Sequence, residues 1–198
     1  MNGWLIICLG LLLGCSPAPT DQATPAIPAT PGVLAEEAPA PTPSPEDPEP
    51  LPPHPDSKLE RLQIEVAGAP FVMEVADDLR SRGRGLSGRT RVAPNEGMLF
   101  VYPEPKELGF WMNECLTDLD IIYVDQHGRI KSMHRMKAEP PRREDERQWQ
   151  YEARLPRYRS VHLVQFALEF TPGTIDRLKL RLGDTVELPR ATLIEGAK

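Results

Sequence analysis

The stretch 111–120 holds the densest group of side chains in this sequence that could do chemistry. It combines an aromatic ring, an amide, a thiol and three carboxylates, in the order Trp111, Asn113, Glu114, Cys115, Asp118 and Asp120. Carboxylates at this density can act as general acid and base when burial separates their pKa values, or can bind a hard cation through oxygen. Asp118 and Asp120 would share one strand face, although a buried Asp that holds a turn explains Asp120 equally well.

Three other combinations carry a weaker signal. Cys115 could act as a nucleophile with His134 or His127 as its base, but no third orienting group is evident in the sequence. The four histidines have no zinc-type spacing, so neither a metal nor a cofactor is expected. Five arginines beside glycines could bind phosphate or carboxylate groups of an envelope polymer, although a solvated helix face with one structural arginine is the commoner arrangement: Arg80, Arg82, Arg84, Arg89 and Arg91.

Short segments of alternating or β-rich sequence would position these side chains. They predict strands at 59–66, 71–75, 98–102, 110–112, 119–124, 129–133, 161–170 and 184–188. Asp77 is placed to cap a short helix that ends at Gly85, and 174–180 is a candidate helical turn. Many short strands at close spacing favour a mainly β domain, a compact sandwich or barrel with one or two short helices. The polar segment 138–158 lacks a clear period and is interpreted as an exposed insertion.

The N-terminus has the pattern of an export signal. Residues 4–13 read WLIICLGLLL, an apolar run only half as long as the roughly 20 residues that a spanning helix needs. The run ends in Leu12-Leu13-Gly14-Cys15, which resembles the lipobox of bacterial lipoproteins. That resemblance implies a signal peptide at 1–14 and a lipid on Cys15, while Ser16 is similar to the residue that permits sorting to the outer membrane of Gram-negative bacteria. An ordinary cleaved secretory signal, with Cys15 incidental, is the alternative. Cys115 would then be the remaining thiol, either a buried small hydrophobe or a reactive group.

Residues 15–56 are predicted to form a disordered tether. Between Pro17 and Pro55 lie 14 of the chain's 23 prolines, with six acidic residues and no Lys or Arg. Such a segment cannot bury enough apolar surface to offset its ordering entropy. A single domain is expected at 57–198. Residues 56–198 hold 23 acidic and 23 basic side chains, so the folded part has almost no net charge. A neutral domain gives no broad electrostatic reason to expect nucleic acid as a partner.

Motifs spread over 71–188 resemble a known family. They are Gly85-Leu86 with Arg89, Glu96-Gly97-Met98-Leu99-Phe100, Phe110-Trp111-Met112-Asn113, Leu119-Asp120-Ile121-Ile122, Asp125 with Gly128, Leu168-Glu169 with Pro172-Gly173, and Gly183-Asp184. In order and approximate spacing they are similar to domain of unknown function family 192 of bacteria and archaea. The resemblance implies a compact, jelly-roll-like β sandwich, often exported, with no agreed activity. This chain departs from the family pattern at three positions: it has Ser87, Cys115 and Asp118 where Met, Thr and Pro are usual. A site built on these positions would have diverged in this chain.

The expected function is that of a lipid-anchored envelope module that binds a small molecule, a polymer or a protein. Its cleft would be walled by Trp111 and Asn113 and floored near Asp120, with Arg89 as a further candidate ligand-binding residue. The alternative is a hydrolase or transferase acting on envelope material, with Asp118, Asp120 and His134 as acid, base or ligand. A structural surface protein without a ligand is the third possibility. An enzyme needs at least two of these groups within reach of one point, whereas a binder needs only a lined concavity.

Overall fold

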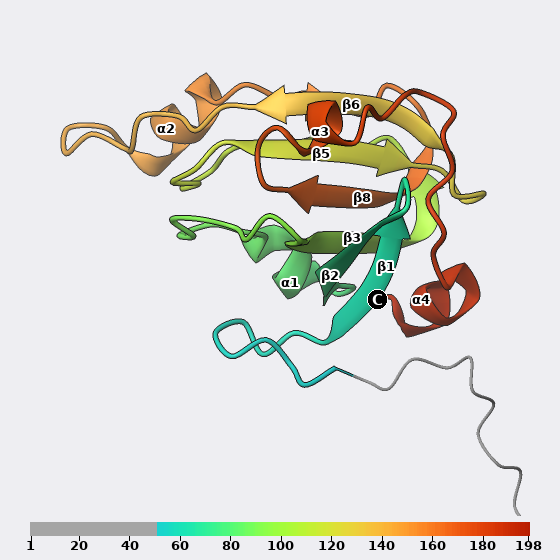
Figure 1. Cartoon of the computed structure of the whole chain (residues 1–198). Coiled ribbons are helices and arrows are strands. Elements are labelled where there is room, and N and C mark those ends of the chain that lie inside the picture. Colours follow the sequence, from blue (N-terminus) through green and yellow to red (C-terminus); the bar gives the residue numbers. More distant parts are fainter. Residues whose placement is uncertain (1–50) are drawn as a thin grey trace, which may run out of the picture. The chain divides into compact units, whose positions relative to one another are not determined.

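The computed structural model describes residues 51–198. The predicted signal peptide, Cys15 and most of the predicted tether lie outside the described residues. Six strands form one mixed sheet in the order β1-β2-β3-β8-β5-β6, and β4 pairs with β7 in a separate two-stranded sheet (Figure 1). The strands are β1 (Arg61–Val66), β2 (Ala69–Ala76), β3 (Glu96–Lys106), β4 (Gly109–Phe110), β5 (Leu119–Val124), β6 (Ile130–Met136), β7 (Tyr158–Arg159) and β8 (Val164–Phe170).

Four short helices accompany the sheet: α1 (Leu79–Arg84), α2 (Gln148–Arg154), α3 (Thr174–Arg177) and α4 (Arg190–Gly196). The predicted mainly β fold with few short helices is confirmed. Neighbouring strands of the large sheet run antiparallel except β2 and β3, which are parallel and are connected through α1. A parallel pair needs a crossover connection, and α1 with the segment after it supplies that crossover.

Side chains alternate between two apolar layers, one on each face of the sheet. On β5, Ile122 and Val124 belong to one cluster, while Ile121 and Tyr123 belong to the other. Because successive strand residues point to opposite faces, a single strand supplies both clusters. The first cluster is completed by the segment that includes α3 and residues 180–188. The second is completed by Leu86, Leu108 and Met112, which come from the loops beside α1 and β4.

Helix α1 begins with a capping box. Asp78 accepts hydrogen bonds from the backbone amides of Arg80 (2.7 Å) and Ser81 (2.9 Å), and the Ser81 hydroxyl lies 3.2 Å from the Asp78 amide. These contacts satisfy amides that have no partner within the helix. The cap is therefore Asp78 rather than the predicted Asp77. The helix ends at Gly85, as the sequence predicts, where a φ of 51° favours glycine.

Three parts of the sequence prediction are wrong. Segment 184–188 makes only isolated bridges, such as Glu65 with Glu187, because it crosses the end of the sheet instead of joining it. Helix α4 was not predicted. Segment 138–158, expected to be exposed, contains α2 and buries Glu146, Tyr151 and Leu155. Glu146 and Arg154 form an ion pair of 2.9 Å beside α2. The segment therefore lacks the apolar stripe by which a packed helix is usually recognised in a sequence.

Within residues 51–198, no helix combines the length and apolar character needed to cross a membrane.

Candidate functional site

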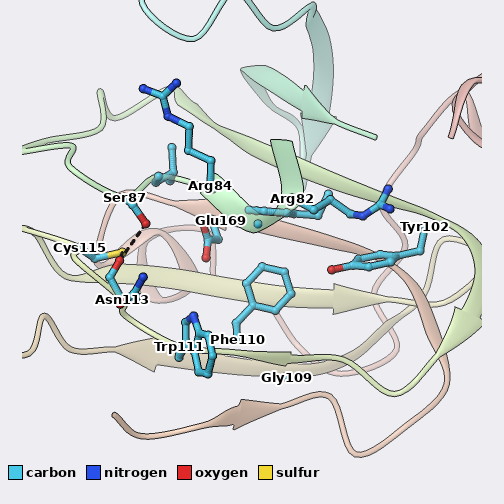
Figure 2. Close-up of a pocket in the computed structure, with 14 residues that line it drawn as sticks. Arg82, Arg84, Ser87, Tyr102, Gly109, Phe110, Trp111, Asn113, Cys115 and Glu169 are labelled. Atoms are coloured by element: carbon cyan, nitrogen blue, oxygen red, sulfur yellow. Dashed lines mark hydrogen bonds between the residues drawn. The ribbon is translucent and has the colours of Figure 1, made fainter. Parts of the chain in front are cut away.

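A pocket opens over the sheet face that carries the second cluster, between α1 with the loop after it and the segment 109–115 (Figure 2). Its cavity volume is about 100 Å³. Aromatic rings, arginines, an amide, a thiol and a carboxyl line it: Arg82, Arg84, Ser87, Phe100, Tyr102, Phe110, Trp111, Asn113, Cys115 and Glu169, together with residues of the Gly83–Leu86 segment. Two of the four residues that the sequence analysis proposed for ligand binding, Trp111 and Asn113, are therefore in this pocket.

The turn that carries Asn113 is held by contacts from two segments of the chain. Glu114 has a positive φ of 55°, a conformation that is uncommon for a residue other than glycine. Its amide donates to the hydroxyl of Tyr151 on α2 (3.0 Å), and its carbonyl accepts from the amide of Gly88 (2.9 Å). The Ser87 hydroxyl donates to the carbonyl of Asn113 (2.8 Å), as Figure 2 shows. The turn is thus fixed to both α2 and the loop after α1.

Glu169 forms the floor of the pocket. It lies on the central strand β8, and its register partners are Met98 on β3 and Ile121 on β5, both apolar. Strands β3 and β8 approach closely at Gly97. A Cβ atom at this position would lie 2.2 Å from the backbone carbonyl oxygen of Glu169, so only glycine fits. The residue is only 5% exposed, and burial raises the pKa of its carboxyl to about 8. At neutral pH this group is a protonated acid.

The side-chain oxygen of Asn113 is the second unusual polar group in the pocket. Among residues 51–198, Asn113 Oδ1 is the buried side-chain atom that has no hydrogen-bond partner. A buried polar atom without a partner costs about 1–3 kcal/mol, so natural proteins rarely leave one without a reason. A buried amide oxygen without a partner, on Asn113, and a buried carboxyl whose pKa is shifted by burial alone, on Glu169, therefore line one cavity.

The arginines in and beside the pocket do not form an ion pair with Glu169. Arg82 donates to the carbonyls of Asp77 (2.6 Å) and Val101 (2.9 Å), and its guanidinium lies 4.8 Å from the centre of the Tyr102 ring. Arg157 lies over the Trp111 ring at 3.1 Å. Arg84 extends away from the cavity in Figure 2. None of these guanidinium groups neutralises Glu169, since burial alone accounts for the raised pKa of that carboxyl.

Cys115 is a buried thiol rather than a poised nucleophile. Its Sγ lies 3.7 Å from the carbonyl of Asn113. Burial, followed by the charges of Glu169 and Glu114, raises the pKa of this thiol to about 12. The thiolate is the reactive form, so a thiol with this pKa is almost inert at neutral pH. The structure does not bring Cys115 together with either His127 or His134.

Asp120 lies on the opposite face of the sheet from the pocket. It shares that face with Ile122 and Val124, and its carboxylate accepts a hydrogen bond from the amide of Ile175 at the start of α3 (2.8 Å). Burial raises its pKa, and the hydrogen bond from Ile175 opposes that rise. The expected cleft with Trp111, Asn113 and Asp120 around it is therefore not formed, because the strand period turns Asp120 away from the other two.

The remaining predicted site residues are also used in structural contacts. Arg89 forms an ion pair of 2.8 Å with the buried Glu74 and lines a neighbouring hollow, not the pocket that Glu169 floors. Asp118 pairs with Lys137 (2.6 Å), which lowers the pKa of Asp118. His134 Nε2 lies 2.8 Å from the carbonyl of Arg159. The alternative catalytic set of Asp118, Asp120 and His134 does not converge on one point. Residues 51–198 contain no cluster of His, Cys, Asp or Glu that could hold a metal ion.

Comparison with known proteins gives the chain a family. The model of domain of unknown function family 192 (DUF192), described as an uncharacterised ACR, matches residues 62–188. This chain belongs to the DUF192 family. No curated protein matches it.

Two solved structures are similar to this DUF192 protein. One is a protein of unknown function from Novosphingobium aromaticivorans DSM 12444, with 26% identity and a TM-score of 0.57 over 72% of this chain and 95% of that chain. The other comes from Sinorhizobium meliloti 1021 and is described as a candidate transcription regulator, with 28% identity and a TM-score of 0.51 over 64% of this chain and 91% of that chain. The structural match therefore covers nearly the whole of both solved chains.

Glu169 is the site residue that the sequence analysis missed in this DUF192 protein. The sequence places Glu169 in a family motif and in the strand predicted at 161–170, but it is not among the predicted site residues. One signal was present in the sequence. A single carboxylate stands between apolar neighbours in the run Phe166-Ala167-Leu168-Glu169-Phe170, and a buried strand rarely carries an acid without a role.

Proposed function

We propose that this DUF192 domain is a non-enzymatic binding module that takes one small group of a ligand into the pocket floored by Glu169. Two observations in one pocket support the proposal. Asn113 Oδ1 is buried without a hydrogen-bond partner among the described residues, and burial alone shifts the pKa of the Glu169 carboxyl, with no hydrogen bond or charged group acting on it. Burying such groups is unfavourable unless something bonds to them. A ligand that supplies the missing bonds recovers that free energy on binding.

The size of the pocket limits what enters it. A cavity of about 100 Å³ is smaller than the roughly 150 Å³ that accommodates benzene. The pocket therefore accepts a head group or a single side chain, and the rest of the ligand lies outside. Phe110 and Trp111 form a wall beside Asn113 in Figure 2, so the entering group passes an aromatic surface before it reaches the polar floor.

The second part of the proposal places this module in the cell envelope. Residues 1–14 would act as the signal peptide, Cys15 would carry the lipid, and residues 15–56 would hold the domain away from the outer membrane of a Gram-negative bacterium. The ligand would then be an envelope small molecule, polymer or protein. A role in binding DNA, which the description of the Sinorhizobium protein raises, has no support in a domain with 23 acidic and 23 basic side chains.

Binding is tested with four probes of equal chain length and different head groups: n-butylamine, n-butanol, butyramide and butyrate. Each is titrated into the purified full-length protein while the amide signals of Asn113 and the indole signal of Trp111 are followed by NMR. Fragments of this size bind at best with millimolar to micromolar Kd values, by order of magnitude. At least one probe is expected to shift these signals in a saturable way. The proposal fails if all four probes leave both residues unchanged.

Two matched pairs of variants localise the binding. Ser87→Met fills the pocket and should abolish the shifts, whereas Ser87→Ala removes the same hydroxyl without filling it and should retain them. Trp111→Ala should weaken binding at little cost in stability, whereas Trp149→Ala, on the outer surface of α2 with 63% exposure, should not affect it. Binding that survives Ser87→Met would place the ligand elsewhere.

The membrane anchor has its own test. Mass spectrometry of the mature N-terminus is expected to find an acylated Cys15, and Cys15→Ala should move the protein from the membrane fraction to the soluble fraction. A Cys15→Ala protein that stays on the membrane would contradict the lipid anchor.

A further inference from the structure

We infer that the group that enters the pocket is a primary ammonium, which donates hydrogen bonds to the Glu169 carboxylate and to Asn113 Oδ1 and lies against the aromatic wall. This inference rests on the proposed binding function and specifies its ligand. Two observations carry it: the acceptor groups in the pocket, and a second buried glutamate in the same sheet that has a cationic partner.

Once Glu169 is ionised, the two groups that a ligand would meet in the pocket are acceptors. Asn113 Oδ1 can only accept a hydrogen bond, and a carboxylate at Glu169 would likewise be acceptor only. A primary ammonium is a compact cation with three donors and no acceptor, so it complements both groups at once. A ligand carboxylate would instead bring another acceptor to the Asn113 oxygen and another negative charge beside Glu169.

The pocket walls favour a cation for an independent reason. Phe100, Tyr102, Phe110 and Trp111 all line the cavity. Phe110 meets Phe100 edge to face, with ring centres 4.7 Å apart and planes at 87°, and it meets Tyr123 in the same manner at 5.7 Å. The faces of aromatic rings carry negative electrostatic potential and attract cations within about 6 Å. Arg82 and Lys106 already lie over the Tyr102 ring, and Arg157 lies over the Trp111 ring. Phe100 and Phe110 are therefore the rings that remain for a ligand cation.

A second buried glutamate, Glu74, shows what a buried carboxylate looks like in this sheet when the chain supplies its cationic partner. The register across the sheet places Glu74, Met98 and Glu169 in one row on β2, β3 and β8. Glu74 and Glu169 are equally buried, each with 5% exposure. Glu74 is paired with Arg89 (2.8 Å), accepts a hydrogen bond from Ser57 and lies 3.7 Å from His54.

Glu169 receives no such partner from residues 51–198, although it is only two strands away from Glu74. The chain therefore supplies a guanidinium to one buried carboxylate and leaves the other facing a cavity. Arg82, which lines the pocket, donates to backbone carbonyls, and Arg157 lies over the Trp111 ring. An ammonium from outside takes the place at Glu169 that Arg89 has at Glu74.

Binding of this cation releases a proton. Glu169 holds its proton at neutral pH, and the ammonium interacts best with the carboxylate. The balanced step is the loss of the carboxyl proton to solvent as the ammonium, which keeps its own three protons, enters the pocket. Affinity must therefore rise with pH through the titration of Glu169, up to the pH at which the amine itself loses its proton.

Other charged and titratable groups line the pocket or lie on the same face of the sheet as Glu169. Arg82 and Arg84 come from α1, Tyr102 from β3, and Cys115 from the turn after β4. Tyr123 lies on β5, and burial raises the pKa of both tyrosines and of the thiol, so these groups stay uncharged between pH 6 and 9. His134 lies on the same face beyond Ile121. The Glu169→Gln variant therefore tests whether a pH dependence of binding comes from Glu169.

The test titrates n-butylammonium into the full-length protein at pH 6, 7, 8 and 9. With a pKa of about 8 at Glu169, the ionised fraction rises from about 1% to about 90%, so affinity should increase by roughly 50- to 100-fold. Glu169→Gln should bind the amine at least tenfold more weakly than the parent protein at pH 9 and without this pH dependence. The control Glu74→Gln should keep the pH dependence, even if its melting temperature falls.

The outcomes separate this inference from the proposed function. If n-butanol, butyramide or butyrate shifts the Asn113 signals and n-butylammonium does not, the pocket binds a ligand but the ammonium assignment is wrong. Binding of n-butylammonium that is equally strong at pH 6 and pH 9, or that survives Glu169→Gln, also overturns the assignment. If none of the four probes binds, the proposed function itself fails.

Discussion

The backbone amide of Glu114 donates a hydrogen bond of 3.0 Å to the hydroxyl of Tyr151, and this contact ties the turn that carries Asn113 to helix α2. The relationship gives a structural role to segment 138–158, which looks like a loop in the sequence. Tyr151 is fully buried, and the guanidinium of Arg154 lies 4.8 Å from its ring centre. One wall of the pocket is therefore supported from a segment about 40 residues away in the chain.

Tyr151→Phe should weaken this support. It removes the acceptor of the Glu114 amide and retains the ring, so the free energy of unfolding should fall by about 1–2 kcal/mol. Urea denaturation measures the change. Trp149→Phe on the exposed face of the same helix is the control and should stay within about 0.5 kcal/mol of the parent protein. Equal stability of Tyr151→Phe and the parent would mean that the Glu114 turn does not depend on α2.

Stability should fall as pH rises, and Glu169 should be the main cause. Its pKa is raised to about 8 in the folded protein, so the unfolded chain loses this proton first and stability declines from about pH 5 to pH 8. Glu169→Gln removes the ionisable group, and at pH 9 the variant should be more stable than the parent by roughly 2–5 kcal/mol. The measurement is urea denaturation at pH 5, 7 and 9. A parent protein as stable at pH 9 as at pH 5 would contradict the prediction.

Asp120 should matter for folding and not for binding. Asp120→Ala leaves the amide of Ile175 without its acceptor, so unfolding should become easier by about 1–3 kcal/mol. Asp120→Asn keeps an oxygen that can accept this bond and should be closer to the parent. Both folded variants should give the parent response to the probe that binds at Asn113. A loss of binding in a well-folded Asp120→Asn variant would contradict this prediction, because it would mean that Asp120 affects the pocket on the other face of the sheet.

Cys115 should react slowly with iodoacetamide. With a pKa of about 12, its thiolate fraction at pH 8 is orders of magnitude below that of a free cysteine, so alkylation should be at least about 100-fold slower than that of a cysteine peptide. Peptide mass spectrometry resolves this residue from Cys8 and Cys15. Glu169→Gln removes one negative charge beside the thiol and should accelerate the reaction. A rate near that of the free peptide would show that the thiol is open to solvent and ionised.

The fold was largely predictable because local sequence signals agreed with it. The strands at 61–66, 69–76 and 119–124 lie within about two residues of the predicted segments, since alternation of apolar residues is a local property. Helix α2 could not be predicted in this way. Its stability depends on the pairing of Glu146 with Arg154 and on the burial of Tyr151, and both are contacts between segments that fold together.

The site was predictable only in part, for a reason that follows from sheet geometry. Proximity in sequence grouped Trp111 and Asn113 correctly with one pocket, but it also added Asp120, which the period of two turns to the other face. Glu169 joins the pocket through the pairing of β8 with β3 and β5. That pairing is a long-range property, and a lone acid in an apolar strand was the one local sign of it.

The central position of β8 has a consequence for how ligand binding can be observed. Every residue of this strand is buried, and it is paired on both sides, so its amides should exchange hydrogen for deuterium only when the whole domain unfolds. The loop after α1 and the turn at Asn113 are held by a few single hydrogen bonds and can open locally. A ligand that bonds to Glu169 should therefore slow exchange at the rim of the pocket. The amides of β8 itself, the strand that carries Glu169, will not reveal binding through a change in local opening.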